Sequence, residues 1–357
     1  MDREKVLEKF DSIVKAYSKT DKIALIHDLD ADGVSSGVLT FHAIKLLRGK
    51  EPDLVITQSH KTTKLMPETL ELLKEHKINK LITVDFALDQ QKESVKEAEA
   101  IVDEILVIDH HKDYELTSPK TFILKANYIK ELDPSKYPTS KLVYDLFSRH
   151  VSLQKFSWLS CVGLIGDNQL EVWRDSVEKA KADHGSSIEE FFTVSSIITS
   201  VEVLVPEQLN DLFYFIASSF TPKQVIDSKY NEYLKKLDSE VERVKEKFEE
   251  GKEVFEKQEL IWFEFESEHN VKSAVVNNVS NNIYPNQTVI FVQDKHDGFV
   301  SFSARRQDFK VKTNDLLEKA ITGFEQAGAG GHIPASAGRI KKEDLPEFKK
   351  RILEALS

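Results

Sequence analysis

The first 130 residues contain five short runs rich in Val, Ile and Leu, and these runs constrain the fold more than any other feature of the sequence. They alternate with segments of helical periodicity, for example VSSGVLTFHAIKLL and PETLELLKEHK. Apolar strands that alternate with helices are typical of a parallel sheet with helices on both faces, and in such sheets ligands gather at the carboxyl ends of the strands. We therefore expect an α/β fold with a parallel-sheet N-terminal domain. The expected strands are KIALIH (22–27), DLVITQS (53–59), KLITVDF (80–86), EILVIDH (104–110) and TFILKA (121–126).

The rest of the chain predicts helices followed by a smaller C-terminal α/β domain. Residues 138–220 have mostly helical patterns, and apolar residues recur every three or four positions over 222–250, which is typical of one long amphipathic helix. We interpret this helix as a connector between domains, and a dimerising coiled coil is the alternative. The expected domains are 1–185, a helical region with the connector helix over 186–255, and a second α/β domain over 256–357.

Composition restricts the class of protein. With 357 residues, 40% of them hydrophobic, the chain can bury a sizeable core. The one cysteine, Cys161, excludes a disulfide framework and favours a reducing compartment. The charged start MDREKVLEKF does not resemble a signal peptide, and no apolar run reaches the about 18 residues of a membrane span, so we expect a cytoplasmic protein. The net charge of −11 argues against a broad basic surface, so an anionic substrate would need metals or arginines.

Three aspartates follow the first expected strand in the stretch IALIHDLDADG. The run DxDxDG is also how a calcium loop of the EF-hand type begins, but such a loop needs a Glu at its twelfth position and a helix before it. The twelfth position from Asp28 is Leu39, and a strand pattern precedes Asp28, so the calcium loop is excluded. One aspartate could cap the following helix. Three such carboxylates, Asp28, Asp30 and Asp32, would repel one another unless a cation neutralises them.

Further acidic and histidine residues follow other apolar runs. Asp85 ends LITVDF, the triplet Asp109, His110 and His111 ends LVIDHH, and Asp167 follows CVGLIG. Each alone is ordinary as a helix cap or a surface histidine, but most of them fall at one edge of one sheet. Carboxylate and imidazole ligands suit manganese, iron, zinc or magnesium, and two such ions roughly 3.5–4 Å apart can clamp a phosphate and activate a water. The sequence therefore predicts a binuclear metal phosphoesterase with a bridging aspartate.

The motifs DLDADG, VDF, IDHH and GLIGD, in this order, resemble the four motifs of the DHH phosphoesterase superfamily. GFVSFSARRQD and GAGGHIPASAG resemble the arginine strand and the glycine–histidine loop of the DHH-associated domain. DLDADG and the long connector helix resemble the RecJ-like nucleases more than the small-oligonucleotide phosphodiesterases. The resemblance spans residues 28–338, and it implies a DHH catalytic domain followed by a domain that binds the substrate.

The resemblance also implies roles for the acidic and histidine residues. The three aspartates of DLDADG would together supply the first metal cluster, Asp85 would bridge the two metals, and His110 and Asp167 would hold the second ion. His111 would face the scissile phosphate, and Asp109 would steady its histidine neighbours. The implied metal ligands are Asp28, Asp30, Asp32, Asp85, His110 and Asp167.

In the second domain, the resemblance implies a phosphate clamp at Arg305, because a guanidinium meets phosphate in a bidentate fork. Arg306 departs from the family pattern and is expected to be an extra phosphate contact. One more residue than usual separates His332 from Gly338, which also affects the grip on the substrate. The implied substrate contacts are Ser303, Arg305, Arg306, Gly330, Gly331 and His332.

The function implied is a metal-dependent exonuclease or oligonucleotidase that releases mononucleotides from single-stranded DNA or RNA or from short oligonucleotides. Its cofactors would be two divalent ions, manganese first and magnesium as the alternative. One competing function is the hydrolysis of polyphosphate, a cyclic dinucleotide or another small phosphate ester. Another is a replication or repair scaffold, although such a protein would be expected to lose metal ligands. A replication or repair protein is also a candidate partner of the enzyme, and the polarity of attack and the oligomeric state stay open.

Overall fold

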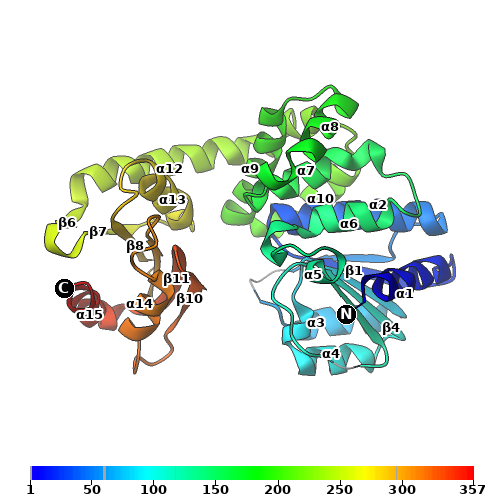
Figure 1. Cartoon of the computed structure of the whole chain (residues 1–357), viewed down its shortest axis with the longest axis horizontal. Helices are drawn as coiled ribbons and strands as arrows, with labels where there is room; N and C mark the ends of the chain where they lie inside the picture. The colour runs from blue at the N-terminus through cyan, green and yellow to red at the C-terminus, as the bar shows by residue number, and fades with distance from the viewer. Residues whose placement is uncertain (1, 59–61, 117, 295) are drawn as a thin grey trace. The chain divides into compact units, whose positions relative to one another are not determined.

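The computed structural model describes residues 2–58, 62–116, 118–294 and 296–357, with the side chain of His332 left out. The chain forms two compact units, which divide between Leu234 and Lys235 (Figure 1). The helical region expected at 186–255 is therefore shared between the two units. No described helix combines the length and the apolar character that crossing a membrane requires. The expected cytoplasmic location stays a prediction.

The first unit is built on a five-stranded parallel sheet in the order β2-β1-β3-β4-β5, which confirms the predicted fold class. Each expected strand is present with ends one or two residues shorter, and Ser59 of the second run lies outside the described residues. The strands are β1 (Ile23–His27), β2 (Leu54–Thr57), β3 (Lys80–Val84), β4 (Glu104–Asp109) and β5 (Thr121–Lys125).

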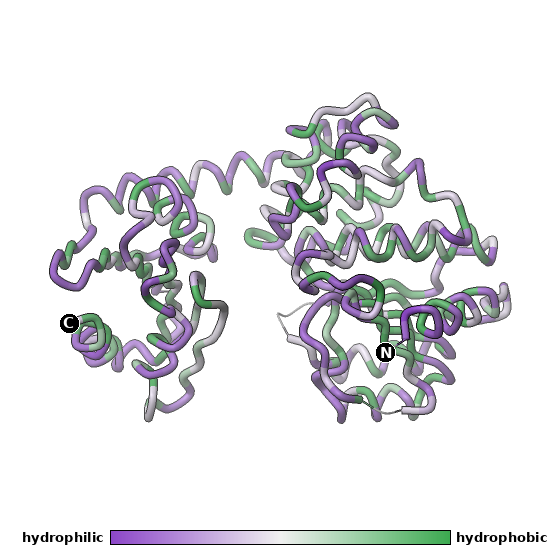
Figure 2. The backbone as a smooth tube through the Cα atoms, in the orientation of Figure 1, coloured by the Kyte–Doolittle hydropathy of each residue, from purple (hydrophilic) through white to green (hydrophobic). Residues whose placement is uncertain are grey.

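Both faces of this sheet are buried, as an apolar strand without polar alternation requires. Along β1, Ile23 and Leu25 join one hydrophobic cluster, whereas Ala24 and Ile26 join another on the opposite face. The colouring in Figure 2 shows these strands as mainly hydrophobic. The helices of this unit are α1 (Arg3–Ala16), α2 (Ala31–Arg48), α3 (Pro67–Glu75), α4 (Lys92–Glu99), α5 (Ala126–Ile129), α6 (Thr139–Phe147), α7 (Ser157–Gly166), α8 (Arg174–His184), α9 (Ile188–Leu204), α10 (Leu209–Ala217) and α11 (Pro222–Ile226).

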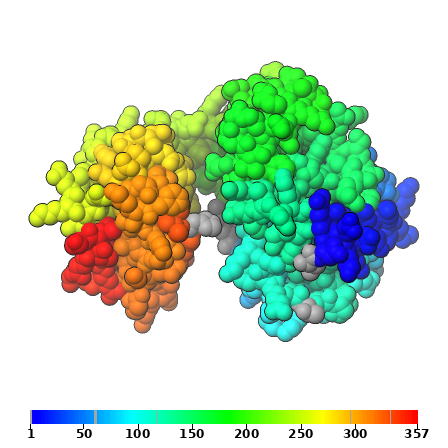
Figure 3. Space-filling model, in the orientation of Figure 1, coloured from blue at the N-terminus to red at the C-terminus, as the bar shows by residue number. Residues whose placement is uncertain are grey.

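The helices divide between the two faces of the sheet. Helices α1, α2, α6, α7 and α9 contribute to the larger cluster, and α3 and α4 contribute to the smaller one. Helix α1 lies at the surface of the unit, as the blue residues of Figure 3 show. The chain thus leaves β1 toward one face and leaves the adjacent β3 toward the other. This reversal creates a crevice at the carboxyl ends of β1 and β3, where sheets of this kind bind ligands.

The one long helix expected over 222–250 is two helices, so that prediction is wrong. A turn at residues 227–230 separates α11 from α12 (Asn231–Gly251). Tyr230, in this turn, is buried in the core of the first unit. Phe248 of α12 packs against Phe263 and Phe291 of the second unit, with ring centroids 5.4 and 5.2 Å away. Part of the apolar face that the coiled-coil alternative needs is therefore covered within the chain.

The second unit contains a six-stranded sheet in the order β10-β11-β9-β8-β7-β6, which confirms a smaller C-terminal α/β domain. All its pairs are antiparallel except β7 with β8. Its strands are β6 (Glu253–Phe255), β7 (Leu260–Glu266), β8 (Thr288–Asp294), β9 (Phe299–Arg305), β10 (Gly328–His332) and β11 (Ala335–Lys341). Its other helices are α13 (Lys272–Asn282), α14 (Thr313–Ala320) and α15 (Leu345–Ala355).

The glycine-rich segment expected to be a loop is instead a β-hairpin of β10 and β11. Gly331 has φ +138° and pairs with Ser336, and a Cβ at this position would lie 2.5 Å from the carbonyl oxygen of Ala335. Only glycine fits such a backbone, because the contact involves main-chain atoms that cannot move aside. Glycine at 331 thus permits close pairing within the hairpin.

Candidate active site

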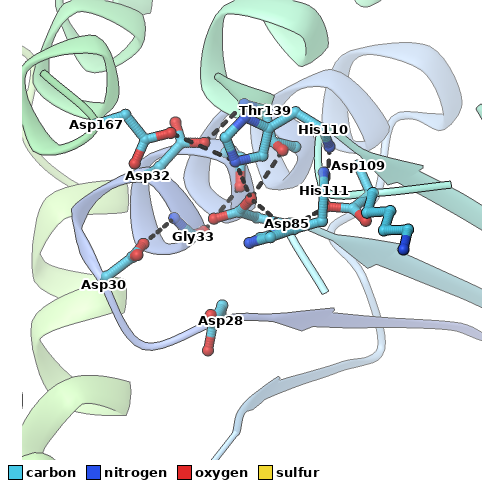
Figure 4. Close-up of polar contacts among 12 residues, drawn as sticks. Asp28, Asp30, Asp32, Gly33, Asp85, Asp109, His110, His111, Thr139 and Asp167 are labelled. Carbon is cyan, nitrogen blue, oxygen red and sulfur yellow. Dashed lines mark hydrogen bonds and ion pairs between the residues drawn. The ribbon is translucent and has the colours of Figure 1, made fainter. Parts of the chain in front are cut away.

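The acidic and histidine motifs gather at the carboxyl edge of the parallel sheet, around the crevice between β1 and β3 (Figure 4). Asp28, Asp30 and Asp32 follow β1, Asp85 follows β3, and Asp109 ends β4 ahead of the two histidines. Asp167 reaches the same place from the end of α7. These motifs are far apart in the sequence, but they meet in one cluster because parallel strands end at the same edge of the sheet.

Within this cluster, three groups of side chains have donor atoms within 4.8 Å of one another. Asp85 belongs to two of these groups. Asp32 does not group with the other two aspartates of its motif, contrary to the expectation that all three serve one ion. The groups are Asp28, Asp30 and Asp85; Asp32, His110 and Asp167; and Asp85, His110 and His111.

Local helix geometry separates the three aspartates. Asp30 is the N-cap of α2, and its Oδ1 accepts from the amide of Gly33 at 2.9 Å. Asp32 lies inside the first turn of α2, where its two oxygens accept from the amides of Thr139 at 2.6 Å and Ser140 at 3.0 Å. These amides begin α6, whose N-cap is a proline that offers no side-chain bond. Asp32 therefore caps α6 from another helix, a favourable place for a negative charge.

Asp85 is almost completely enclosed, with 2% of its surface exposed. Its backbone has φ +54°, in the left-handed region where asparagine, aspartate and histidine are enriched among residues other than glycine. The hydroxyl of Thr139 donates to its Oδ1 at 2.8 Å, and Nε2 of His110 lies 3.5 Å from the same oxygen. Burial, followed by the charges of Asp32 and Asp30, raises the pKa of Asp85 well above its usual range.

The two histidines have different surroundings. Nε2 of His110 lies 3.4 Å from Oδ2 of Asp167, and burial lowers the pKa of His110, which favours the neutral imidazole that binds metals. His111 has 46% of its side chain exposed, and its Nδ1 lies 2.8 Å from Oδ1 of Asp109. Burial lowers the pKa of His111, but the bond with Asp109 outweighs this effect and raises it overall. His110 therefore faces the carboxylates, and His111 lines the pocket beside them with its side chain partly exposed.

The residues present fit two divalent cations. Burial, followed by the charge of Asp30, raises the pKa of Asp28 to about 6, and burial, followed by the charges of Asp32 and Asp30, raises that of Asp167 to about 9, so each carboxylate is repelled by its acidic neighbours. Oxygen donors with a histidine nitrogen are the set that manganese accepts, and magnesium accepts the carboxylates. A pocket of about 430 Å³ adjoins them, lined by Asp28, Asp30, Asp85, His111 and Glu202 among others. Cations would relieve this repulsion, and the pocket leaves room for a phosphate group.

The sequence did not point to several side chains that hold the site in place. The hydroxyl of Thr139 donates to Asp85 and the backbone amide of Ser140 donates to Asp32, while the missing side chain of Gly163 in α7 lets Asp32 approach, since a Cβ there would lie far too close to its carboxylate. Lys125 contacts Asp109 at 2.6 Å. The segment PTS before an apolar helix does indicate a helix start. The identity of the carboxylate that caps it depends on tertiary structure alone.

The second unit places the expected substrate contacts in different surroundings. Arg305 is partly buried at the end of β9, and its Nε donates to Asn277 at 2.6 Å. No carboxylate forms an ion pair with it among the residues that the structure describes. Ser303 is fully buried. Gly330 and Gly331 lie in β10, and the side chain of His332 falls outside what is described.

The structure does not support a phosphate contact at Arg306. This side chain is 1% exposed and forms ion pairs with Glu259 at 2.5 Å and Asp308 at 2.7 Å. Arg306 follows the last residue of β9, and its guanidinium also donates to the carbonyl oxygen of Glu259 at 3.4 Å. Arg306 therefore stabilises the end of β9 from within the fold, and we withdraw it from the substrate contacts.

Two family models match the sequence: the DHH family, N-terminal domain, over residues 22–163, and the DHHA1 domain over residues 258–357. No curated protein sequence matches the chain. Among solved structures, RecJ from Thermus thermophilus in complex with Mn²⁺ is similar with a TM-score of 0.74 at 17% identity. The match covers 99% of this chain and 55% of that RecJ, so this chain corresponds to about half of it.

Two further structures are similar in fold. An exonuclease RecJ bound to manganese has a TM-score of 0.71 at 17% identity, covering 98% of this chain and 94% of its own. A pGpG-specific phosphodiesterase, PggH from Vibrio cholerae, has a TM-score of 0.50 at 14% identity, covering 94% and 99%. The chain therefore belongs to the DHH superfamily of phosphoesterases, with a DHH domain followed by a DHHA1 domain in a RecJ-like fold.

Proposed function

We propose that this protein is a binuclear metal-dependent phosphodiesterase that releases mononucleotides from single-stranded DNA or RNA or from short oligonucleotides. The observation that carries the proposal is the position of Asp85. This carboxylate groups with Asp28 and Asp30 on one side and with His110 on the other, and His110 also groups with Asp32 and Asp167. A carboxylate shared between two sets of ligands is the arrangement that a two-ion centre requires.

Manganese is the cofactor that we propose, with magnesium as the alternative. When bound, the ions would supply an activated water and neutralise charge on the phosphate. Asp28 and Asp30 would hold one ion, Asp32, His110 and Asp167 the other, and Asp85 both. The similar RecJ structures contain Mn²⁺, which supports this choice of metal.

The chain's own groups would position the substrate. His111 lines the pocket beside Asp28 and Asp85, so its free Nε2 would contact the scissile phosphate. Thr139 keeps the carboxylate of Asp85 in one orientation through its hydroxyl. In the second unit Arg305 stays our proposed phosphate clamp, because its guanidinium has no carboxylate partner among the described residues. The amides of Gly330 and Gly331 would contact the rest of the nucleotide, and His332 stays a proposed substrate contact from its place in the sequence.

The test is hydrolysis of end-labelled single-stranded DNA and RNA with added Mn²⁺, scored by product size. The wild type should release mononucleotides, and Asp85→Asn should release none. Asp53→Asn is the matched control, because Asp53 precedes β2 at the opposite edge of the same sheet and should leave hydrolysis unchanged. A wild type that degrades neither nucleic acid would refute the nuclease activity.

A second candidate is the hydrolysis of a small phosphate ester such as a linear or cyclic dinucleotide, or of polyphosphate. The fold similarity to the pGpG-specific phosphodiesterase favours it. The same metal ligands would serve, so only the substrate distinguishes the two activities. Faster turnover of pGpG or polyphosphate than of an octanucleotide would select this candidate. A scaffold without activity would hydrolyse none of these substrates, with or without Asp85.

A further inference from the structure

We propose that Lys125 is a positioning residue of the active site, which fixes Asp109 so that Asp109 holds the ring of His111 toward the pocket. The consequence for catalysis rests on the proposed function, whereas the effect on His111 does not. Lys125 ends β5, and its register partner on the neighbouring strand is Asp109, which ends β4. A lysine at this position therefore lies beside the histidine pair without being near it in sequence.

The ammonium of Lys125 is completely enclosed, with 0% of its side chain exposed. Its Nζ lies 2.6 Å from Oδ2 of Asp109, 2.9 Å from Oδ1 of Asp89 and 3.4 Å from the carbonyl oxygen of Lys112. An ammonium group has three donors, so each of them has an acceptor. Lys125 thus binds Oδ2 of the Asp109 carboxylate and leaves Oδ1 available to accept hydrogen bonds from other groups.

The other oxygen of Asp109 faces the histidines (Figure 4). Oδ1 accepts from the amide of His110 at 2.9 Å and that of His111 at 3.3 Å, and it lies 2.8 Å from Nδ1 of His111. Because a carboxylate only accepts hydrogen bonds, Nδ1 of His111 must carry the proton. Nε2 is then the ring atom left for the pocket that Asp28 and Asp85 line. The tautomer and the ring orientation of His111 thus follow from the orientation of Asp109.

Asp89 anchors the other side of Lys125. It lies in the 3₁₀ helix Leu88–Gln90, four residues after Asp85, and it is fully buried. Its Oδ2 accepts from the amide of Tyr114 at 3.0 Å, which ties down the segment after His111. Lys125 therefore joins the segment after β3, the end of β4 and the chain beyond the histidines. Without its ammonium, two buried carboxylates would face each other with no cation between them.

The test is Lys125→Met, which keeps the length of the side chain and removes its three donors. Histidine ¹⁵N NMR of the metal-free full chain reports the tautomer of His111 without any substrate. At a pH at which the ring of His111 is neutral, we expect a single Nδ1-protonated tautomer in the wild type and a mixture of the two tautomers in the variant. We also expect kcat to fall about 10- to 100-fold, the usual effect of removing a group that orients a catalytic side chain, with KM changed far less. The proposal would be overturned if Lys125→Met changed neither the tautomer of His111 nor kcat.

Two further variants keep the test decisive. Lys80→Met is the control. Lys80 pairs with Glu104 at 3.1 Å where β3 and β4 begin, at the edge of the sheet away from the site, so this change should leave His111 and kcat unchanged. If Lys125→Met does not fold, Lys125→Met with Asp89→Asn removes the uncompensated second charge and should still show the mixed tautomer. A wild-type tautomer in that double variant would overturn the proposal. If the variant shows the mixed tautomer but the wild type hydrolyses no substrate, the role of Lys125 in positioning His111 is supported. Only the proposed function is then refuted.

Discussion

Gly163 leaves room for the Asp32 carboxylate, so the change Gly163→Ala tests how tightly the site is packed. A methyl group there would lie 2.7 Å from Cβ of Ser140 and closer still to its hydroxyl and to Oδ1 of Asp32. Ordinary carbon contacts begin near 3.4 Å, so these groups would have to move by about 1 Å. Asp32 has little freedom to do so, because both of its oxygens accept amides at the start of α6.

Two opposing effects set the stability of the Gly163→Ala variant. Overpacking costs about 1–3 kcal/mol, and replacing glycine by alanine inside a helix returns about 1 kcal/mol. We therefore expect the free energy of unfolding of the metal-free protein to fall by about 0–2 kcal/mol. Displacement of Asp32 should weaken Mn²⁺ binding about 10- to 100-fold. Saturating Mn²⁺ stabilises the folded protein in proportion to the logarithm of its affinity. A 100-fold weaker affinity would therefore make this stabilisation about 2.7 kcal/mol smaller than in the wild type.

The assay combines Mn²⁺ titration calorimetry with urea unfolding, in the presence and absence of Mn²⁺. Adding Ser140→Gly to the variant separates the two contacts, because it removes the clash with Ser140 and leaves the one with Asp32. We expect this double variant to stay weak in Mn²⁺ binding. Wild-type affinity in Gly163→Ala would refute the reasoning, and recovery in the double variant would assign the effect to Ser140 instead of Asp32.

Three further predictions follow from single contacts. Thr139→Val removes the hydroxyl donor to Asp85 and should lower the stability by about 1–2 kcal/mol and lower kcat, measured by urea unfolding and initial rates; no change in either would contradict the role of this bond. Burial raises the pKa of Asp53, but hydrogen bonds from lysine and arginine side chains outweigh it and hold that pKa well below its usual range. The wild type should thus be more stable than Asp53→Asn by about 1–3 kcal/mol above pH 5, and this difference should vanish as the pH falls through the low folded-state pKa; a constant difference would count against it. Arg306→Met removes the hydrogen bonds of a buried guanidinium to Asp308 and Glu259, so it should lower the stability by about 1–3 kcal/mol and leave KM unchanged, whereas a raised KM at wild-type stability would restore its expected phosphate contact.

The sheet and the gathering of the acidic motifs could be predicted because both depend on local pattern. Apolar runs indicate buried strands, and a motif that directly follows such a strand must lie at the carboxyl edge of the sheet. The roles within the site depend on contacts between distant segments. Nothing in DLDADG separates Asp32 from its two neighbours until the start of α6 comes to lie against it. Lys125 is unremarkable in TFILKA, because its importance comes from pairing β5 with β4.

The errors have physical causes of the same kind. Helical periodicity continues through residues 227–230, but the burial of Tyr230 in the first unit ends one helix before the next begins. The glycine-rich segment has the composition of a loop, and it forms a hairpin because β11 pairs with β9 on one side and β10 on the other. The second of two adjacent arginines predicts an extra phosphate contact, but Arg306 is buried and its guanidinium is paired with Glu259 and Asp308.

The most direct test of the central claim is the rate of mononucleotide release from an end-labelled single-stranded octanucleotide, measured as a function of Mn²⁺ concentration. A two-ion phosphodiesterase whose ions share Asp85 predicts a sigmoidal dependence in the wild type and no release by Asp85→Asn at any Mn²⁺ concentration. Release by Asp85→Asn at the wild-type rate, or a wild type that needs no divalent ion, would contradict the account.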